Sequence, residues 1–399
     1  MHISYPSQHF HSQTFPSPLH HFKKERKKNM WDDLPLDLLS QIFSYLPLDS
    51  LARAMSTCKH WHTCAISRPP RPGRRHPPWF LSMHVRSPAR SCRAYNPAVD
   101  RWLSIPLDFA ARPVRFIGSV GDGLILCKFG PGPLSRLGLC NPFTRQFDEL
   151  PDLVCSRRNP AFAVVMGADE KLEVYVAGGT PEPNSPRMGQ VLIEPTVEMY
   201  SQRAGGWRVI GSIPGHFATL LTVWTFGEGV HVGGTVYWVT SARAYTVVAY
   251  EIGPRAWREV KVPETERLLW AGLFCRAGGL GLAGGTSEGG LSVWELGAGD
   301  EWSMIDAAPP EMMGGFRSVN RGGDGDIRCA ATRGGGGGVD LYMYSSLGCG
   351  IIVRRELPDK KSGEWFLIDG VKMCPKVLPM KGVLIHPSMS SNVCFASSH

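Results

Sequence analysis

Histidine and cysteine side chains form the densest group of residues whose types could do chemistry, because both bind zinc. The group is Cys58, His60, His62 and Cys64. The apolar residues around this group are spaced as in a helix, so we expect the group to lie on one. Residues two positions apart on a helix do not share a face. The four side chains therefore cannot converge on one metal ion without unwinding the helix, and we expect neither a metal nor another cofactor.

Catalytic signatures are the second place to look for chemistry. The chain has no H-E-x-x-H motif and no G-x-x-x-x-G-K-[ST] motif, which mark metalloproteases and P-loop nucleotide enzymes. His216 and His231 are separate histidines in the C-terminal part, whereas a copper centre would need several ligands to converge. We interpret these histidines as core or surface residues, and we predict that the chain is not an enzyme.

The net charge of +8 is concentrated in two short segments. Residues 23–28 and residues 68–75 each contribute +4, so the rest of the chain is balanced. Nucleic-acid binding needs basic charge spread over a folded face, so we exclude it as the main function. The run at 23–28 is compatible with a nuclear localisation signal or with a solvated tail. We expect the protein in the cytoplasm, in the nucleus or in both.

Residues 1–29 are polar and rich in histidine, without the apolar segment of a signal peptide. We expect this tail to be disordered. No run of 18 apolar residues occurs in the sequence, which predicts neither a membrane span nor a membrane partner. The 11 cysteines are scattered without a C-x-x-C pair, as expected for free thiols in a reducing compartment.

Residues 30–67 are predicted to form two or three short helices. Pro35 suits the first turn of a helix, where its missing N–H costs nothing. Large apolar residues then recur at helical spacing until Pro47, and they are Leu38, Leu39, Ile42, Phe43 and Leu46. About 35 residues are too few to bury so many large side chains, so we expect the surplus to face a partner.

The same stretch resembles an F-box. The resemblance rests on the pair Leu34-Pro35, the LLxxIFxxL core at 38–46, Leu51-x-Arg53 and Cys58-Lys59-x-Trp61. Residues 55–57, Met-Ser-Thr, depart from the valine-rich approach that is more common in the family. An F-box implies docking onto a Skp-type adaptor and, through it, onto a cullin-RING ubiquitin ligase. The residues expected to form or directly support the adaptor interface are Leu34, Pro35, Leu38, Leu39, Ile42, Leu46, Leu51 and Trp61.

Residues 79–399 are predicted to consist of repeats, separated from the helices by an extended proline-rich linker at 68–78. Each repeat has a large residue, a second one seven or eight positions later, and then a proline. The pairs are Tyr95/Trp102, Cys140/Phe147, Tyr200/Trp207, Tyr250/Trp257, Trp294/Trp302 and Tyr344/Ile351. The second members follow one another at intervals of 45 to 60 residues, and such a period is typical of kelch repeats.

Six repeats predict an all-β propeller of six four-stranded blades. Each pair is expected to flank a hairpin turn, and the glycine pairs at 178–179, 233–234 and 284–285 are interpreted as ends of the kelch strand. The segment KGVLIHP, starting at Lys381, is expected to supply a strand that closes the ring, and the run at 334–338 a loop. Helices and repeats together resemble the plant-type F-box/kelch-repeat family.

This resemblance implies a substrate-recognition subunit of an SCF-type ubiquitin ligase. The F-box would bind the Skp-type adaptor, and the propeller would bind a protein that is ubiquitinated and degraded by the proteasome. Two alternatives stay open: a kelch scaffold that acts outside any ligase, and a galactose-oxidase-like kelch enzyme. Copurification with cullin separates the first of these from the ligase subunit.

Target-binding residues are expected in two kinds of loop, the one between strands two and three of a blade and the connection to the next blade. Both kinds open on the same face. Arginines gathered there would suit carboxylates or phosphates, so the target is expected to be acidic or phosphorylated. The candidates are Arg112, Arg157, Arg158, Arg187, Phe217, Arg243, Arg267, Phe316 and Arg317.

Overall fold

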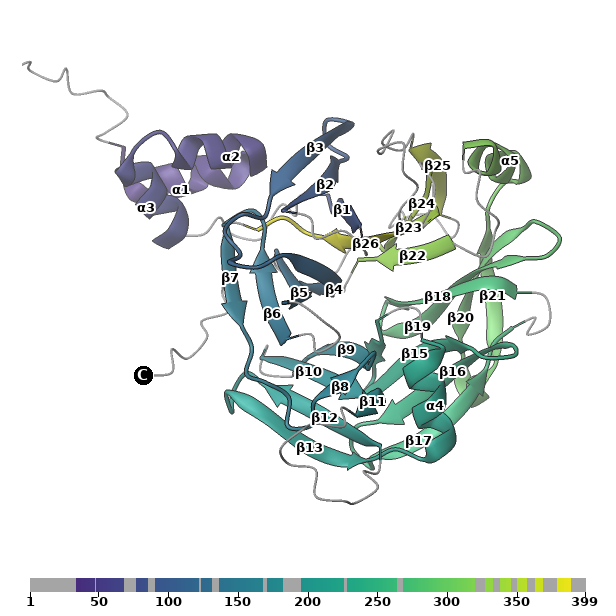
Figure 1. The fold of residues 1–399 in the computed structure, drawn as a ribbon. Coiled ribbons are helices and arrows are strands. Elements are labelled where there is room, and N and C mark those ends of the chain that lie inside the picture. The colour runs from purple at the N-terminus through teal and green to yellow at the C-terminus, as the bar shows by residue number, and fades with distance from the viewer. Residues whose placement is uncertain are drawn as a thin grey trace, which may run out of the picture.

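The structure is a computed structural model. It describes residues 34–388 apart from 47, 68–76, 85–89, 122, 131–135, 168–170, 182–194, 226–227, 264–267, 320–326, 333–337, 346–349, 357–362 and 369–378. The expected tail at 1–29, most of the linker at 68–78 and most of the glycine run at 334–338 lie outside the described residues. Three helices come first in the described chain, and a ring of sheets follows (Figure 1).

The three N-terminal helices enclose a small core of their own. They are α1 (Leu36–Tyr45), α2 (Leu48–Met55) and α3 (Lys59–Ser67). Pro35 immediately precedes α1, and Asp37 lies in its first turn, where the helix dipole favours negative charge. The core consists of Leu39, Phe43, Leu51, Ala54, Cys64 and Ala65, with Leu34, Leu46, Met55 and Trp61 packed against it.

Six four-stranded antiparallel sheets form the blades of a propeller (Figure 1). Written from the innermost strand outward, blade one contains β26 (Met380–Ile385), β1 (Trp79–His84), β2 (Ser91–Asn96) and β3 (Arg101–Pro106), and blade two contains β4 (Val114–Gly121), β5 (Leu124–Phe129), β6 (Arg136–Asn141) and β7 (Gln146–Glu149). Blade three contains β9 (Ala161–Met166), β10 (Leu172–Ala177), β12 (Thr196–Ser201) and β13 (Gly206–Ser212).

The second half of the ring repeats this order. Blade four contains β14 (Val230–Val232), β15 (Thr235–Ser241), β16 (Tyr245–Glu251) and β17 (Ala256–Lys261). Blade five contains β18 (Leu268–Arg276), β19 (Gly279–Thr286), β20 (Leu291–Leu296) and β21 (Trp302–Ala307), and blade six contains β22 (Ile327–Ala331), β23 (Asp340–Ser345), β24 (Ile351–Arg355) and β25 (Glu364–Ile368). The connections between blades hold β8 (Arg157–Arg158), α4 (Gly215–Val223) and α5 (Pro310–Val319), and β8 pairs with β11 (Thr180–Pro181).

The ring is closed by its last strand. β26 pairs antiparallel with β1 along its whole length, from Trp79 opposite Ile385 to His84 opposite Met380. The strand expected from KGVLIHP therefore exists, and it supplies the innermost strand of blade one. Radial closure of this kind leaves only short sheet edges exposed.

Five of the six predicted pairs flank the turn between strands three and four of a blade. Tyr95 lies opposite Trp102, and the pairs in blades two to four follow the same register. In blade five the two tryptophans stand on β20 and β21, but Trp302 lies opposite Leu296. These hairpins confirm the predicted repeat in blades one to five.

The sixth pair was assigned to the wrong hairpin. Tyr344 lies opposite Ile351, but these residues belong to strands two and three of blade six. The outer hairpin of that blade places Arg354 opposite Trp365. An arginine takes the place of the first aromatic residue in this hairpin. The repeat pattern therefore predicted the neighbouring hairpin, whose two large residues have a similar spacing.

The three glycine pairs do not occupy equivalent places. Residues 178–179 follow β10, the second strand of blade three, and residues 284–285 lie within β19, the second strand of blade five. Residues 233–234 instead form the turn between β14 and β15, with φ of 55° and 79°. A turn with positive φ at both central residues favours glycine, so this pair ends the first strand of its blade, whereas the other two pairs lie at or near the end of a second strand.

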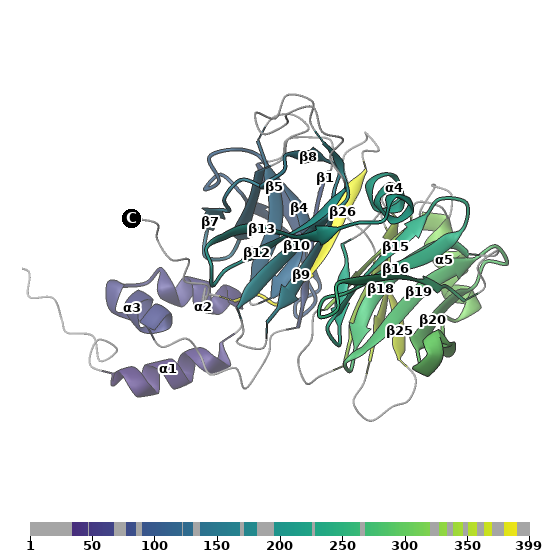
Figure 2. The same ribbon diagram turned by 90° about the horizontal axis from the view of Figure 1, so that it is seen from below.

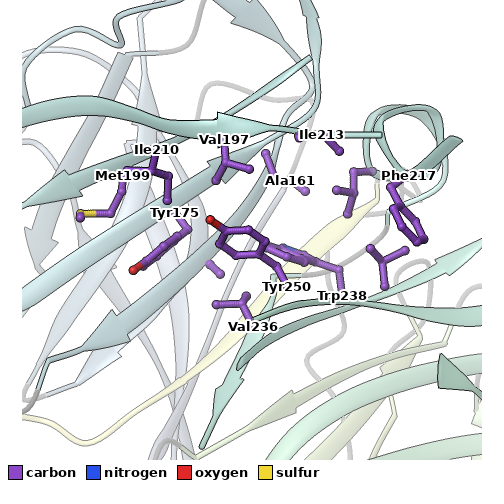
Figure 3. Close-up of a cluster of buried hydrophobic side chains, with 14 of the residues drawn as sticks. Ala161, Tyr175, Val197, Met199, Ile210, Ile213, Phe217, Val236, Trp238 and Tyr250 are labelled. Carbon is purple, nitrogen blue, oxygen red and sulfur yellow. The ribbon is translucent and has the colours of Figure 1, made fainter. Parts of the chain in front are cut away.

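Neighbouring blades pack through apolar side chains that alternate along their strands. Figure 3 shows the cluster between blades three and four, which contains Tyr175, Trp238 and Tyr250 together with Phe217 of α4. On the outside, Trp257 donates an indole hydrogen bond of 3.3 Å to the backbone oxygen of Ser212 in the preceding blade. Trp207 and Trp302 make corresponding bonds to Pro151 and Lys261, at 2.8 and 2.7 Å.

Candidate functional site

An apolar stripe is exposed along α1. Leu38, Ile42 and Tyr45 follow at spacings of four and three, which places them on one side of a helix, and they are 50%, 42% and 61% exposed. Pro35 and Leu36 are exposed beside them. A soluble helix normally turns such a stripe toward a core, but the core of the three helices is formed by the opposite side of α1. The stripe is therefore available to a partner.

Some of the predicted adaptor-binding residues lie on the surface, and the others support them from the helical core. Pro35, Leu38 and Ile42 are exposed, whereas Leu39 and Leu51 are buried in the helical core. The half-buried members are Leu34, Leu46 and Trp61. Trp61 of α3 meets Phe43 of α1 edge to face, with ring centres 5.5 Å apart, and so fixes the angle between the two helices.

Leu36 and Tyr45 were missed by the sequence analysis, although both lie on the exposed part of α1. Tyr45 stands three residues after Ile42, so the helical spacing that identified the other residues could have identified it as well. Leu36 adjoins Pro35 at the start of the helix.

The predicted loops do meet on one face of the propeller, which we call the target face. Arg158 of β8, in the connection to blade three, pairs with Thr180 of β11, in the loop between strands two and three of that blade. Thr222 of α4 accepts a hydrogen bond of 2.7 Å from the amide of Gly179 in the same loop. The two kinds of loop therefore belong to one surface, as expected for antiparallel blades.

Three candidate residues on that face are structural, and their assignment to target binding is corrected here. Phe217 and Phe316 lie on the buried sides of α4 and α5, within the apolar clusters between blades. Arg157 is buried, donates to the backbone oxygens of Cys155, Gly178 and Thr196, and pairs with the carboxylate of Glu198. None of the three can reach a target without leaving the core.

Four candidate arginines are exposed on the target face, and they come from four separate loops. Arg112 and Arg158 lie in the connections that lead to blades two and three, and Arg317 lies on α5. Arg243 lies in the turn between β15 and β16. The two remaining candidates, Arg187 and Arg267, fall outside the described residues.

The helices are attached to the opposite face. β1 begins at Trp79 on the side of the turns between strands three and four, and β26 ends at Ile385 on that same side. Figure 2 shows α1 toward one side of the ring, and α4 and β8 toward the other. The chain thus presents its exposed apolar helix and its target face in different directions.

One catalytic motif escaped the sequence analysis. Residues 285–289, Gly-Thr-Ser-Glu-Gly, match the G-x-S-x-G pattern of a hydrolase nucleophile. That chemistry needs the serine on a sharp turn from strand to helix, whereas Ser287 lies in the turn between β19 and β20. The context therefore does not fit a nucleophile.

His216 and His231 lie on different elements. His216 is exposed on α4 against the ring of Phe217, and His231 stands on β14. Among the residues that the structure describes, no group of three or more His, Cys, Asp or Glu could hold a metal ion. None of the described helices is long and apolar enough to cross a membrane.

Comparison with known proteins matches the helical part to a family and finds relatives that extend into the propeller. Residues 31–68 match the F-box-like family model. The F-box/kelch-repeat protein At5g43190 of Arabidopsis thaliana is 22% identical over 73% of this chain and 72% of its own length. F-box protein At3g08750 of the same plant is 23% identical over 65% and 69%, and F-box/kelch-repeat protein At3g61590 is 30% identical over 29% of each chain.

The fold and these similarities define an F-box protein whose helical unit precedes a six-bladed propeller. Residues 31–68 belong to the F-box-like family, and the chain as a whole is similar to plant F-box and F-box/kelch-repeat proteins.

Proposed function

We propose that this chain is the substrate-recognition subunit of an SCF-type ubiquitin ligase. In this proposal α1 and the residues around it dock onto a Skp-type adaptor, which connects the chain to cullin. The propeller holds a target protein for ubiquitination and proteasomal degradation. The chain then needs no catalytic residues of its own, because ubiquitin transfer is carried out by other subunits.

The observation that carries the proposal is the exposed stripe of Leu38, Ile42 and Tyr45 on a helix whose other side has its own core. A few central apolar residues usually dominate an interface, each contributing about 2 kcal/mol or more. The F-box-like match covers this helix, and an F-box implies docking onto a Skp-type adaptor. The placement of the target face away from the helical attachment further supports simultaneous binding of adaptor and target.

A binding assay with a purified Skp-type adaptor tests the docking step. Leu38→Asp combined with Ile42→Asp places two charges in the stripe and should weaken adaptor binding by at least about tenfold. The matched control is Leu103→Asp combined with Val209→Asp, two exposed apolar residues on outer propeller strands. Equal binding by the two double variants would remove the assignment of α1 as the docking helix.

The proposed place of action is the cytoplasm, the nucleus or both, where SCF ligases would meet the target. The alternative of a scaffold outside a ligase predicts adaptor-independent function. It is distinguished by whether cullin copurifies with the chain.

A further inference from the structure

The innermost strands of the ring all begin at the target face, because each follows the connection from an outer strand. The second residue of β22 is Arg328, that of β26 is Lys381 and that of β4 is Arg115. These strands belong to blades six, one and two, and they lie next to one another around the axis (Figure 1). Three neighbouring inner strands therefore each carry a cationic residue at their second position.

A fourth cation adjoins this row. Lys128 of β5 lies directly opposite Arg115 in the sheet, and its ammonium group is 4.6 Å from the ring centre of Phe162 in blade three. Burial, together with the smaller effect of the charge of Arg115, lowers the pKa of Lys128 to about 8. We call Arg115, Lys128, Arg328 and Lys381 the axial basic site.

One carboxylate reaches this region from across the ring. Glu228 precedes β14 of blade four, and its side chain lies against Gly118 of β4 at a place that a Cβ atom would fill. Burial lowers the pKa of Lys381, Glu228 opposes that shift, and Arg328 adds to it. Glu228 and Arg328 are thus both within electrostatic reach of Lys381, as Arg115 is of Lys128.

The corresponding positions elsewhere in the ring are not basic as a set. Blade three has Phe162 and blade five has Leu269, which is 40% exposed beside the hydroxyl of Tyr245. Blade four has His231. The cations are therefore confined to one arc, next to an arc with apolar side chains.

Such an arrangement is unfavourable for the protein alone, because like charges held close together and partly desolvated disfavour one another. An anion relieves this repulsion, and two guanidinium groups with two ammonium groups offer many charge-assisted donors. We propose that the axial basic site binds a carboxylate or phosphate group on an acidic or phosphorylated segment of the target protein. This inference rests on the proposed function, in which the target face holds a protein.

Two labelled peptides test the site on the full chain by fluorescence anisotropy. One alternates glutamate with glycine, and the other alternates phosphoserine with glycine, at equal length. Tighter binding of the phosphoserine peptide identifies a phosphorylated segment, and equal or tighter binding of the glutamate peptide an acidic one. Raising the salt concentration should weaken either complex, because the groups are partly exposed.

Arg328→Gln and Lys381→Gln should each weaken peptide binding by about tenfold or more, as expected for loss of a charge-assisted contact. Arg203→Gln changes an exposed arginine in the turn between β12 and β13, on the opposite face, and as the control it should change binding less than twofold. Leu269→Glu adds a negative charge at an exposed position without removing a half-buried cation, and should weaken binding relative to Leu269→Gln. The two Leu269 variants keep the test decisive even when the protein does not fold with a substitution at Arg328 or Lys381.

Absence of peptide binding by the wild-type chain contradicts the proposal, and so does binding that is insensitive to Arg328→Gln, Lys381→Gln and Leu269→Glu in folded protein. The titration needs no adaptor. A failed titration with intact adaptor binding therefore overturns the axial site alone. Loss of adaptor binding with an intact titration overturns the proposed ligase role alone.

Discussion

The indole Nε1 of Trp302 donates a hydrogen bond of 2.7 Å to the backbone oxygen of Lys261, and so joins the outer strands of blades five and four. Trp207 and Trp257 bind the preceding blades in the same way. The aromatic residues that mark the repeat in the sequence are thus the residues that fasten each blade to its neighbour. This relationship explains why a repeat pattern in a single chain can specify a closed ring.

Trp257→Ala should destabilise the ring. The side chain stacks near Tyr250 and Trp238, with ring centres 4.7 and 6.2 Å away, in addition to its hydrogen bond. Removing a large aromatic residue from a core costs about 3–5 kcal/mol, and the half-buried position suggests the lower end. Chemical denaturation measures the loss, with exposed Met304→Ala as the control. Unchanged stability would show that this tryptophan does not hold neighbouring blades together.

Arg157→Met should be strongly destabilising, because it leaves the fully buried carboxylate of Glu198 without its cation. Breaking a buried ion pair costs about 3–5 kcal/mol. Exposed Arg136, which pairs with Glu149 and Asp152, is the matched control, and Arg136→Met should cost no more than about 1 kcal/mol. Equal losses in the free energy of unfolding would contradict a structural role for Arg157.

Lys128→Met should stabilise the protein at pH 7, and the gain should shrink as the pH rises to 10. The native pKa of Lys128 is lowered to about 8, whereas an unfolded lysine titrates near about 10.4. The unfolded chain therefore binds more protons between these values, and wild-type stability rises with pH across that window. Denaturation at pH 7, 8.5 and 10 measures the difference, with Lys261→Met on an exposed strand position as the control. A gain in the free energy of unfolding that does not change with pH would contradict a lowered pKa of Lys128 in the folded protein.

Charge reversal tests the exposed arginines of the target face. Arg158→Glu combined with Arg317→Glu should weaken binding of the glutamate peptide severalfold at low salt, by repulsion from the loops around the axis. The effect should diminish at physiological salt, because both side chains are exposed. Anisotropy titrations at two salt concentrations measure it. Identical affinities at low salt would exclude any contribution of these loops.

The helical unit and five blades were predictable because their signals are local. Helical spacing placed Leu39 and Phe43 together, and a pair seven residues apart marks a hairpin whichever blade contains it. The sixth blade was predicted as well, but its outer hairpin was misplaced because Arg354 stands where the aromatic residue was expected. Its guanidinium is fully buried and donates a hydrogen bond of 2.7 Å to the carboxylate of Asp306 in blade five. This contact replaces the aromatic pair of the other blades, and no spacing in the sequence indicates it.

The candidate site was predictable in its face but not in its residues. Phe217 and Phe316 were expected in loops, but the connections fold into helices whose apolar sides are buried. The spacing of Phe217, Leu220 and Leu221 could have indicated α4. The axial basic site was missed because its members are 13 to 266 residues apart along the chain and are brought onto neighbouring blades only when the last strand closes the ring.

Copurification with cullin tests the central claim most directly. The full chain, expressed with a tag and with the proteasome inhibited, should bring down the Skp-type adaptor and cullin. Leu38→Asp with Ile42→Asp should lose both, while Leu103→Asp with Val209→Asp should retain both. Retention of cullin by the first double variant, or absence of cullin from the wild-type chain, would contradict a ligase subunit that docks through α1.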